Sequence, residues 1–99
     1  MSSWNARELK ILSILLHGEL FGRQIRMEYE KRTKSSMPIG SLYTTLDRME
    51  AKGFIKSREG EPNPEYGGNR RRFYKLTASG SRKLDEIAAQ LGLGGFANG

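Results

Sequence analysis

One stretch of the chain, residues 38–72, limits the possible folds more than any other. Its first part, PIGSLYTTLDRMEAKG, repeats large apolar residues at spacings of three and four: Leu42, Leu46 and Met49, with Ile39 one turn earlier. At 3.6 residues per turn these side chains share one narrow stripe, which is typical of a helix that packs on a small core. We therefore predict an amphipathic helix here, ended by the glycine that follows it.

The segment after this helix has the pattern of a β-hairpin. Residues 54–58 and 70–76 are predicted to be its two strands. The loop between them, EGEPNPEYGG, contains two prolines and three glycines, which favour a chain reversal. A last helix is expected after Thr77, which can cap it.

Two more helices are predicted before this stretch, over residues 6–17 and 23–33. Asn5 can cap the first, with Glu8 completing a capping-box-like pair, and a polar turn at 33–37 joins the second to the amphipathic helix. The predicted fold is α+β and mainly helical: a winged helix-turn-helix of three helices plus a two-stranded β-hairpin wing, with one additional C-terminal helix.

The face of the amphipathic helix opposite its apolar stripe carries hydroxyl groups and charge. At about 100° per residue this face holds Ser41, Thr44, Asp47 and Arg48, with Tyr43 on its flank. Such side chains can donate to phosphates and contact base edges in a DNA groove. The predicted DNA contacts of this helix are Gly40, Ser41, Tyr43, Thr44 and Arg48.

Positive charge is concentrated beside this helix. The 17 lysines and arginines exceed the 11 acidic residues and give a formal net charge of +6, which in a small domain indicates a polyanionic partner. Residues 69–75 hold four positive charges and no acid. Because side chains alternate along a strand, Arg70 and Arg72 share one side, and Phe73 on the other is expected to face the core. Backbone and wing contacts with DNA are predicted for Arg23, Lys34, Ser36, Asn69, Arg70 and Arg72.

Apolar residues of the first and last helices are candidates for a subunit interface. The first helix has apolar side chains on more than one face, and the last has a stripe with little remaining chain to cover it. Because such a patch commonly marks an interface, we predict a two-fold homodimer with two recognition helices about one DNA turn, roughly 34 Å, apart. The alternative is that both stripes pack on each other within one subunit. The predicted interface residues are Trp4, Ile11, Leu15, Leu84, Ile87 and Leu91.

Three segments in this order, ILSILLHGELFGRQI, GSLYTTLDRMEAKGFI and GGNRRRFYKLTASG, resemble the N-terminal DNA-binding domain of PadR-type transcriptional regulators. The resemblance extends from about Leu9 to Leu84, and Arg23 stands where many members have an aromatic residue. It implies a sequence-specific regulator of double-stranded DNA, expected to be a repressor that acts as a homodimer on a palindromic operator. Family members sense an aromatic acid or apolar effector with a long C-terminal helical region. Only about one helix follows Thr77 here, so the question whether this chain binds a small-molecule effector stays open.

A second class of function also stays open: a winged-helix module that contacts protein, or that binds nucleic acid without sequence preference. An enzyme is not expected, because the chain has no cysteine, one histidine, no phosphate-binding loop and no G-x-S-x-G motif. The acidic residues of the loop follow no metal-ligand spacing, so neither a metal nor a cofactor is predicted.

The domain organisation and location follow from composition. A chain of 99 residues is expected to form one domain, assigned to residues 1–92, with a flexible glycine-rich tail at 93–99. The polar N-terminus is unlike a signal peptide, and the longest apolar run, 11–16, is too short to span a bilayer. A cytoplasmic protein without membrane association is the expectation.

Overall fold

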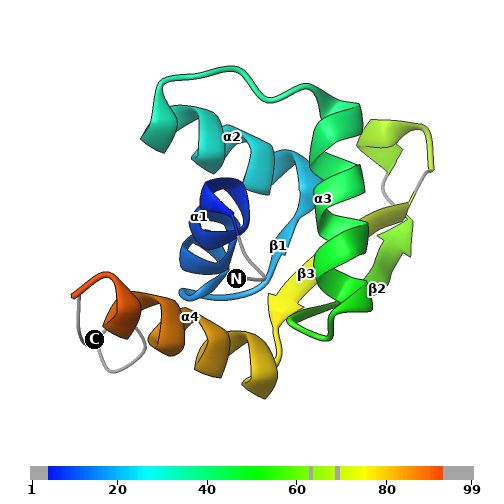
Figure 1. Cartoon of the computed structure of the whole chain (residues 1–99). Helices are drawn as coiled ribbons and strands as arrows, with labels where there is room; N and C mark the ends of the chain where they lie inside the picture. Colours follow the sequence, from blue (N-terminus) through cyan, green and yellow to red (C-terminus); the bar gives the residue numbers. More distant parts are fainter. Residues whose placement is uncertain (1–4, 63, 69, 93–99) are drawn as a thin grey trace.

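The computed structural model describes residues 5–62, 64–68 and 70–92. Trp4, Asn69 and the tail at 93–99 lie outside the described residues, so the predictions made for them remain predictions. The described part contains four helices and three strands, in an α+β winged-helix arrangement (Figure 1). The elements are α1 (Ala6–Leu15), β1 (Leu20–Phe21), α2 (Gly22–Thr33), α3 (Ile39–Ala51), β2 (Ile55–Pro62), the 3-10 turn η1 (Pro64–Tyr66), β3 (Arg70–Leu76) and α4 (Ala78–Gln90).

The strands form one antiparallel sheet in the order β1-β3-β2. We predicted the β2–β3 hairpin but not β1, which is too short for an alternating pattern to show in the sequence. In β1, Phe21 pairs with Phe73 of β3. The wing therefore has three strands rather than two, and β1 connects it directly to the start of α2. Strand β2 also runs four residues beyond its predicted end, with an irregular register between Glu59 and Pro62.

Helix α1 lies at the centre of the molecule, between α2 on one side and α4 on the other (Figure 1). Its N-terminus is capped as predicted, because the Asn5 side chain accepts a hydrogen bond of 2.9 Å from the Glu8 backbone N–H. Glu8 does not complete a capping box. Its buried carboxylate instead accepts hydrogen bonds of 3.1 Å from Lys52 Nζ at both oxygens, which ties the first turn of α1 to the end of α3. None of the helices in the described ranges is long and apolar enough to cross a membrane.

The central position of α1 explains its wide apolar surface without a second subunit. Ile11, Leu15, Leu84 and Ile87 are each exposed by 2 % or less and belong to one core cluster within the chain. The structure therefore does not support an interface made of these four residues. The alternative, in which the stripes of the first and last helices pack inside one subunit, is what the fold contains. Leu91 differs from them, because it is 47 % exposed at the end of α4.

The buried face of α3 follows the predicted stripe except at its first position. Leu42, Leu46 and Met49 are fully buried, but Ile39 is 46 % exposed. The reason is that α3 begins at Ile39, while the turn before it directs Met37 into the core cluster instead.

The wing also turns a different face to the core than we predicted. Tyr74 is 1 % exposed and belongs to the core cluster, whereas its neighbour Phe73 is only half-buried. Both residues are large and apolar enough to be buried, so alternation alone could not decide between them. Because Arg70 and Arg72 alternate with Phe73, they lie on the same strand side as Tyr74.

Two leucines of the last helix provide a test of this packing. Leu84→Ala should lower the free energy of unfolding by about 2–5 kcal/mol, because it leaves a cavity in the core. Leu91→Ala should change it by less than about 0.5 kcal/mol, since that side chain is exposed. Urea denaturation followed by circular dichroism measures both. Equal effects of the two substitutions would contradict the assignment of Leu84 to the interior.

Candidate nucleic-acid interface

The exposed face of α3 carries the side chains predicted for DNA contact. Tyr43, Thr44 and Arg48 are exposed, and so is Gly40, while Ser41 is half-buried. Within the described residues the Arg48 side chain makes no hydrogen bond or ion pair, and its exposed guanidinium can bind a partner molecule. A helix that buries its apolar face and exposes its polar face can enter the major groove of DNA while it stays packed on the core.

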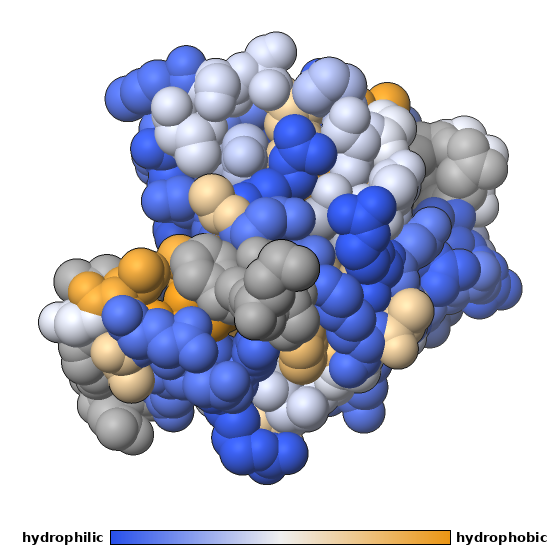
Figure 2. All heavy atoms as spheres, in the orientation of Figure 1, coloured by the Kyte–Doolittle hydropathy of each residue, from blue (hydrophilic) through white to orange (hydrophobic). Residues whose placement is uncertain are grey.

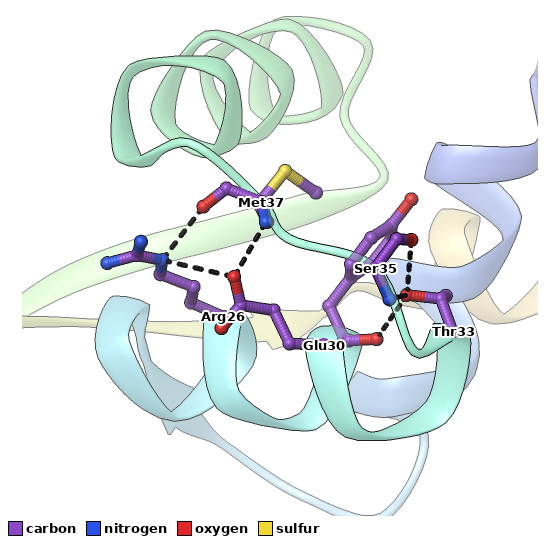
Figure 3. A network of polar contacts seen from close by, with 6 residues as sticks. Arg26, Glu30, Thr33, Ser35 and Met37 are labelled. Carbon is purple, nitrogen blue, oxygen red and sulfur yellow. Dashed lines mark hydrogen bonds and ion pairs between the residues drawn. The ribbon is translucent and has the colours of Figure 1, made fainter.

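The turn between α2 and α3 is held by side chains of α2 (Figure 3). Glu30 Oε2 accepts a hydrogen bond of 2.6 Å from the Met37 N–H, and Arg26 Nε donates one of 2.8 Å to the Met37 carbonyl. Arg26 and Glu30 also form an ion pair of 3.7 Å. Both backbone groups of Met37 are therefore satisfied two residues before α3 begins, and the direction of α3 is set there.

The same turn presents two predicted backbone contacts to solvent. Lys34 ends α2 in the left-handed conformation, with φ of 58°, and its side chain is exposed. Ser36 is exposed as well. Both residues lie in the turn just before α3, so polar and cationic groups are presented at the N-terminal end of this helix.

A groove separates α3 from the wing and reaches the start of α2. It has a volume of about 850 Å³ and is open to solvent. Four arginines and three aromatic residues contribute to its walls, together with one glycine and one aspartate. The lining residues are Phe21, Gly22, Arg23, Tyr43, Asp47, Arg70, Arg71, Arg72 and Tyr74.

Arg23, Tyr43, Arg70 and Arg72, predicted separately from three segments, are thus brought together by the fold. The concentration of arginines makes the groove suited to bind an anion such as a phosphate. The face of the molecule seen in Figure 2 is hydrophilic over most of its surface.

Close packing inside the groove restricts Tyr43. Its ring and hydroxyl lie directly against the α-carbon of Gly22, where any side chain would collide with them. Gly22 is buried at the first position of α2. The absence of a side chain at Gly22 lets Tyr43 pack closely against the start of α2, and a larger residue there would displace the end of the tyrosine ring.

A chain of hydrogen bonds connects α3 to both long strands of the wing. Glu50 of α3 accepts from the Ser57 backbone N–H at 3.1 Å and from the Ser57 hydroxyl at 2.9 Å. The same hydroxyl accepts a hydrogen bond of 3.0 Å from Arg72 Nη1. Arg72 also lies 3.8 Å from a carboxylate oxygen of Glu59. This connection could not be predicted from the sequence, because Glu50 and Ser57 show no pattern that distinguishes them from other surface polar residues.

The other side of the wing is built from stacked aromatic rings and arginines. Phe21 and Phe73 meet edge to face with centroids 5.6 Å apart, Arg58 lies 4.7 Å above Phe73, and Arg71 lies 4.7 Å above Phe21. Arg58 also donates two hydrogen bonds, of 2.6 and 2.9 Å, to Glu19. This contact lowers the pKa of the Glu19 carboxyl group and raises the pKa of Arg58. Stacking of this kind stiffens the wing.

Tyr74 lies under the groove and keeps its proton. Burial of its hydroxyl raises the pKa of Tyr74 to about 12, and the nearby Tyr43, Asp47 and Glu50 act in the same direction, while Arg72 opposes them. At neutral pH the groove therefore has an uncharged phenol beside its arginines. Among the described residues no three histidine, aspartate or glutamate side chains are placed to hold a metal ion together.

A helix with an exposed polar face, set beside a three-stranded basic wing, defines the winged helix-turn-helix class of DNA-binding domains. The chain belongs to the PadR-like family of transcriptional regulators, whose model matches residues 11–86. No curated protein sequence matches the chain.

Solved structures with the same fold include other members of this family. A PadR family transcription regulator from Clostridium difficile is 34% identical, with 88% of this chain and 86% of that chain covered and a TM-score of 0.67. A transcriptional regulator from Clostridium thermocellum is 26% identical, with 86% and 81% covered and a TM-score of 0.73. Bacillus subtilis PadR in complex with operator DNA is 27% identical, with a TM-score of 0.72. The match covers 84% of this chain but only 46% of that one.

The raised pKa of Tyr74 predicts a specific loss of stability at high pH. The folded state holds this proton more tightly than the unfolded state, whose tyrosine has a pKa near 10. The stabilisation is therefore complete below pH 10 and is lost as the pH rises from 10 to 12, by about 3 kcal/mol at most. Urea denaturation at pH 8 and pH 11.5 should show a smaller loss for Tyr74→Phe than for wild type. The same loss in both proteins would contradict this prediction.

Proposed function

We propose that this protein is a sequence-specific regulator that binds double-stranded DNA with α3 and its wing, and that it represses transcription as a homodimer on a palindromic operator. The observation that carries the proposal is the groove between α3 and the wing, where arginines from α2 and β3 flank an exposed helix face. Neither α3 nor the arginines alone would argue for DNA, but their juxtaposition matches the two kinds of contact that DNA requires.

The first kind of contact is to base edges in the major groove. Arg48 is exposed on α3, and an arginine can donate two hydrogen bonds to O6 and N7 of guanine. Thr44 lies one turn earlier on the same face and can donate to or accept from a base. Asp47 is exposed and lines the groove, and its carboxylate can accept a hydrogen bond from the amino group of cytosine.

The second kind of contact is to the phosphates beside the groove. Arg23 is exposed at the second position of α2, where the free backbone N–H groups of a helix start also attract anions. Arg70 is exposed at the start of β3 on the other side of the groove. Each phosphate contact of this kind contributes about one unit to the slope of log affinity against log salt concentration. These contacts position α3 but do not select a sequence.

A solved relative supports DNA as the partner. The structure of Bacillus subtilis PadR contains operator DNA, and the match with it covers 84% of the present chain. The match covers only 46% of that protein. The similarity therefore supports DNA binding, whereas repression and dimerisation are part of our proposal.

The decisive residue for sequence recognition is Arg48. A duplex selected by the wild-type protein from a random library should bind Arg48→Ala more weakly by about 1–3 kcal/mol in the presence of competitor DNA. The expected reason is the loss of two hydrogen bonds to a base. Fluorescence anisotropy with labelled duplex measures the affinity.

The matched control is Arg82→Ala, which removes an exposed arginine of α4, away from the groove. It should retain nearly all of the specific affinity. Full affinity and specificity in a double variant with Thr44→Ala and Arg48→Ala would contradict the assignment of α3. Binding that competitor DNA abolishes for wild type would favour a non-specific nucleic-acid-binding protein or a protein-interaction module instead.

The proposed homodimer relies on the C-terminal end of α4. Leu91 is 47 % exposed there, and Figure 2 shows hydrophobic surface at this end of the molecule, at the lower left. A two-fold contact at this end would cover the leucine and would repeat α3 once on each half-site of a palindrome.

Light scattering at low micromolar concentration tests the dimer. The expected mass is twice the 11.2 kDa of one chain, and Leu91→Asp should shift it towards the mass of the monomer. Met27→Asp is the control, since Met27 is 62 % exposed on α2 and should leave the mass unchanged. A wild-type protein with the mass of a single chain, both alone and on the selected duplex, would contradict the dimer.

A further inference from the structure

Ile39 is a large aliphatic side chain in a position where the fold does not use it. It is 46 % exposed at the first residue of α3. The buried face of this helix is already complete, because Leu42, Leu46 and Met49 are fully buried and Met37 enters the core from the preceding turn. A β-branched residue also brings no advantage in helix propensity over smaller polar residues.

The N-terminal tip of α3, where Ile39 lies, is open to solvent. The next residue, Gly40, is exposed, and a Cβ placed on it would meet nothing within 4 Å. Thr44 is exposed further along the same helix. Figure 2 shows a small hydrophobic area at the upper right edge of the molecule, near the N-terminal end of α3.

We propose that Ile39 determines part of the DNA sequence preference by contacting the 5-methyl group of a thymine in the major groove. This inference depends on the proposed function of α3 as the helix that contacts bases. The first residues of a recognition helix lie closest to the base edges. The thymine methyl is the one apolar group that the four bases present in the major groove, and aliphatic side chains recognise it by burial.

Ile39 suits this contact better than the other apolar side chain nearby. Tyr43 lies one turn further on and is 39 % exposed, but its ring and hydroxyl are packed against Gly22 at the start of α2. Ile39 presents an apolar end to solvent at the tip of the helix, whereas Tyr43 is held towards the groove beside the wing. The two residues therefore serve different contacts.

The test replaces thymine by deoxyuridine, which removes only the methyl group and keeps every hydrogen-bonding group. The probe is the duplex that the wild-type protein selects from a random library, with each thymine replaced in turn. For wild type, one thymine position in each half-site should be sensitive. A single replacement at that position should weaken binding about fourfold, the equivalent of the ~0.8 kcal/mol gained by burying one methylene-sized group. For Ile39→Ala, the same replacement should have no effect.

Two controls make the comparison specific. Met27→Ala removes another exposed aliphatic side chain, on α2, and should keep the wild-type response to deoxyuridine. Ile39→Val keeps a branched aliphatic group and should keep most of the response. Because Ile39 is exposed, all of these variants should show wild-type thermal unfolding by circular dichroism.

The possible failures are distinguishable. If wild type selects a specific duplex but tolerates deoxyuridine at every position, the role of Ile39 is overturned while the proposed function stands. The same holds if Ile39→Ala responds to deoxyuridine as wild type does. If no specific duplex can be selected, the proposed function of α3 fails first and the role of Ile39 fails with it.

Discussion

The other elements of the domain are arranged around one buried face of α3. Leu42, Leu46 and Met49 are fully buried in a core that also receives side chains from each of the other helices. Because the helix repeats every 3.6 residues, burying one stripe leaves the opposite face in solvent along its whole length. The face available for DNA and the face that stabilises the domain are thus two consequences of one periodicity.

Directional polar contacts then fix the orientation of α3, which apolar burial alone does not define. At the start of α3, Arg26 and Glu30 bond both backbone groups of Met37, and at its end Lys52 pairs with the buried carboxylate of Glu8. A buried carboxylate is costly without a partner, so this second contact is worth more in holding the end of α3 to α1 than as a source of net stability. Hydrogen bonds specify orientation, which a recognition helix needs and which hydrophobic contact does not define.

The contacts of individual arginines in the wing, and not the net charge of the chain, determine which positive charges are available in the groove. Arg72 lines the groove, but the strand register places it opposite Glu59 and its guanidinium also donates to Ser57. Arg70 and Arg23 are exposed on the two sides of the same groove. The net charge of +6 therefore indicates an anionic partner, whereas the groove indicates where that partner would lie.

Features that depend on neighbours along the chain could be predicted from the amino-acid sequence. The stripe of α3, the extent of β3 and the caps at Asn5 and Thr77 were all predictable, because helix period and capping involve residues within about four positions. Tertiary structure alone decided that Tyr74 and not Phe73 faces the core, that Ile39 is left exposed, and that two residues of β1 complete the sheet. It also decided that the stripes of α1 and α4 cover each other. Each of these depends on which distant segments meet, and several pairings satisfy the same local pattern.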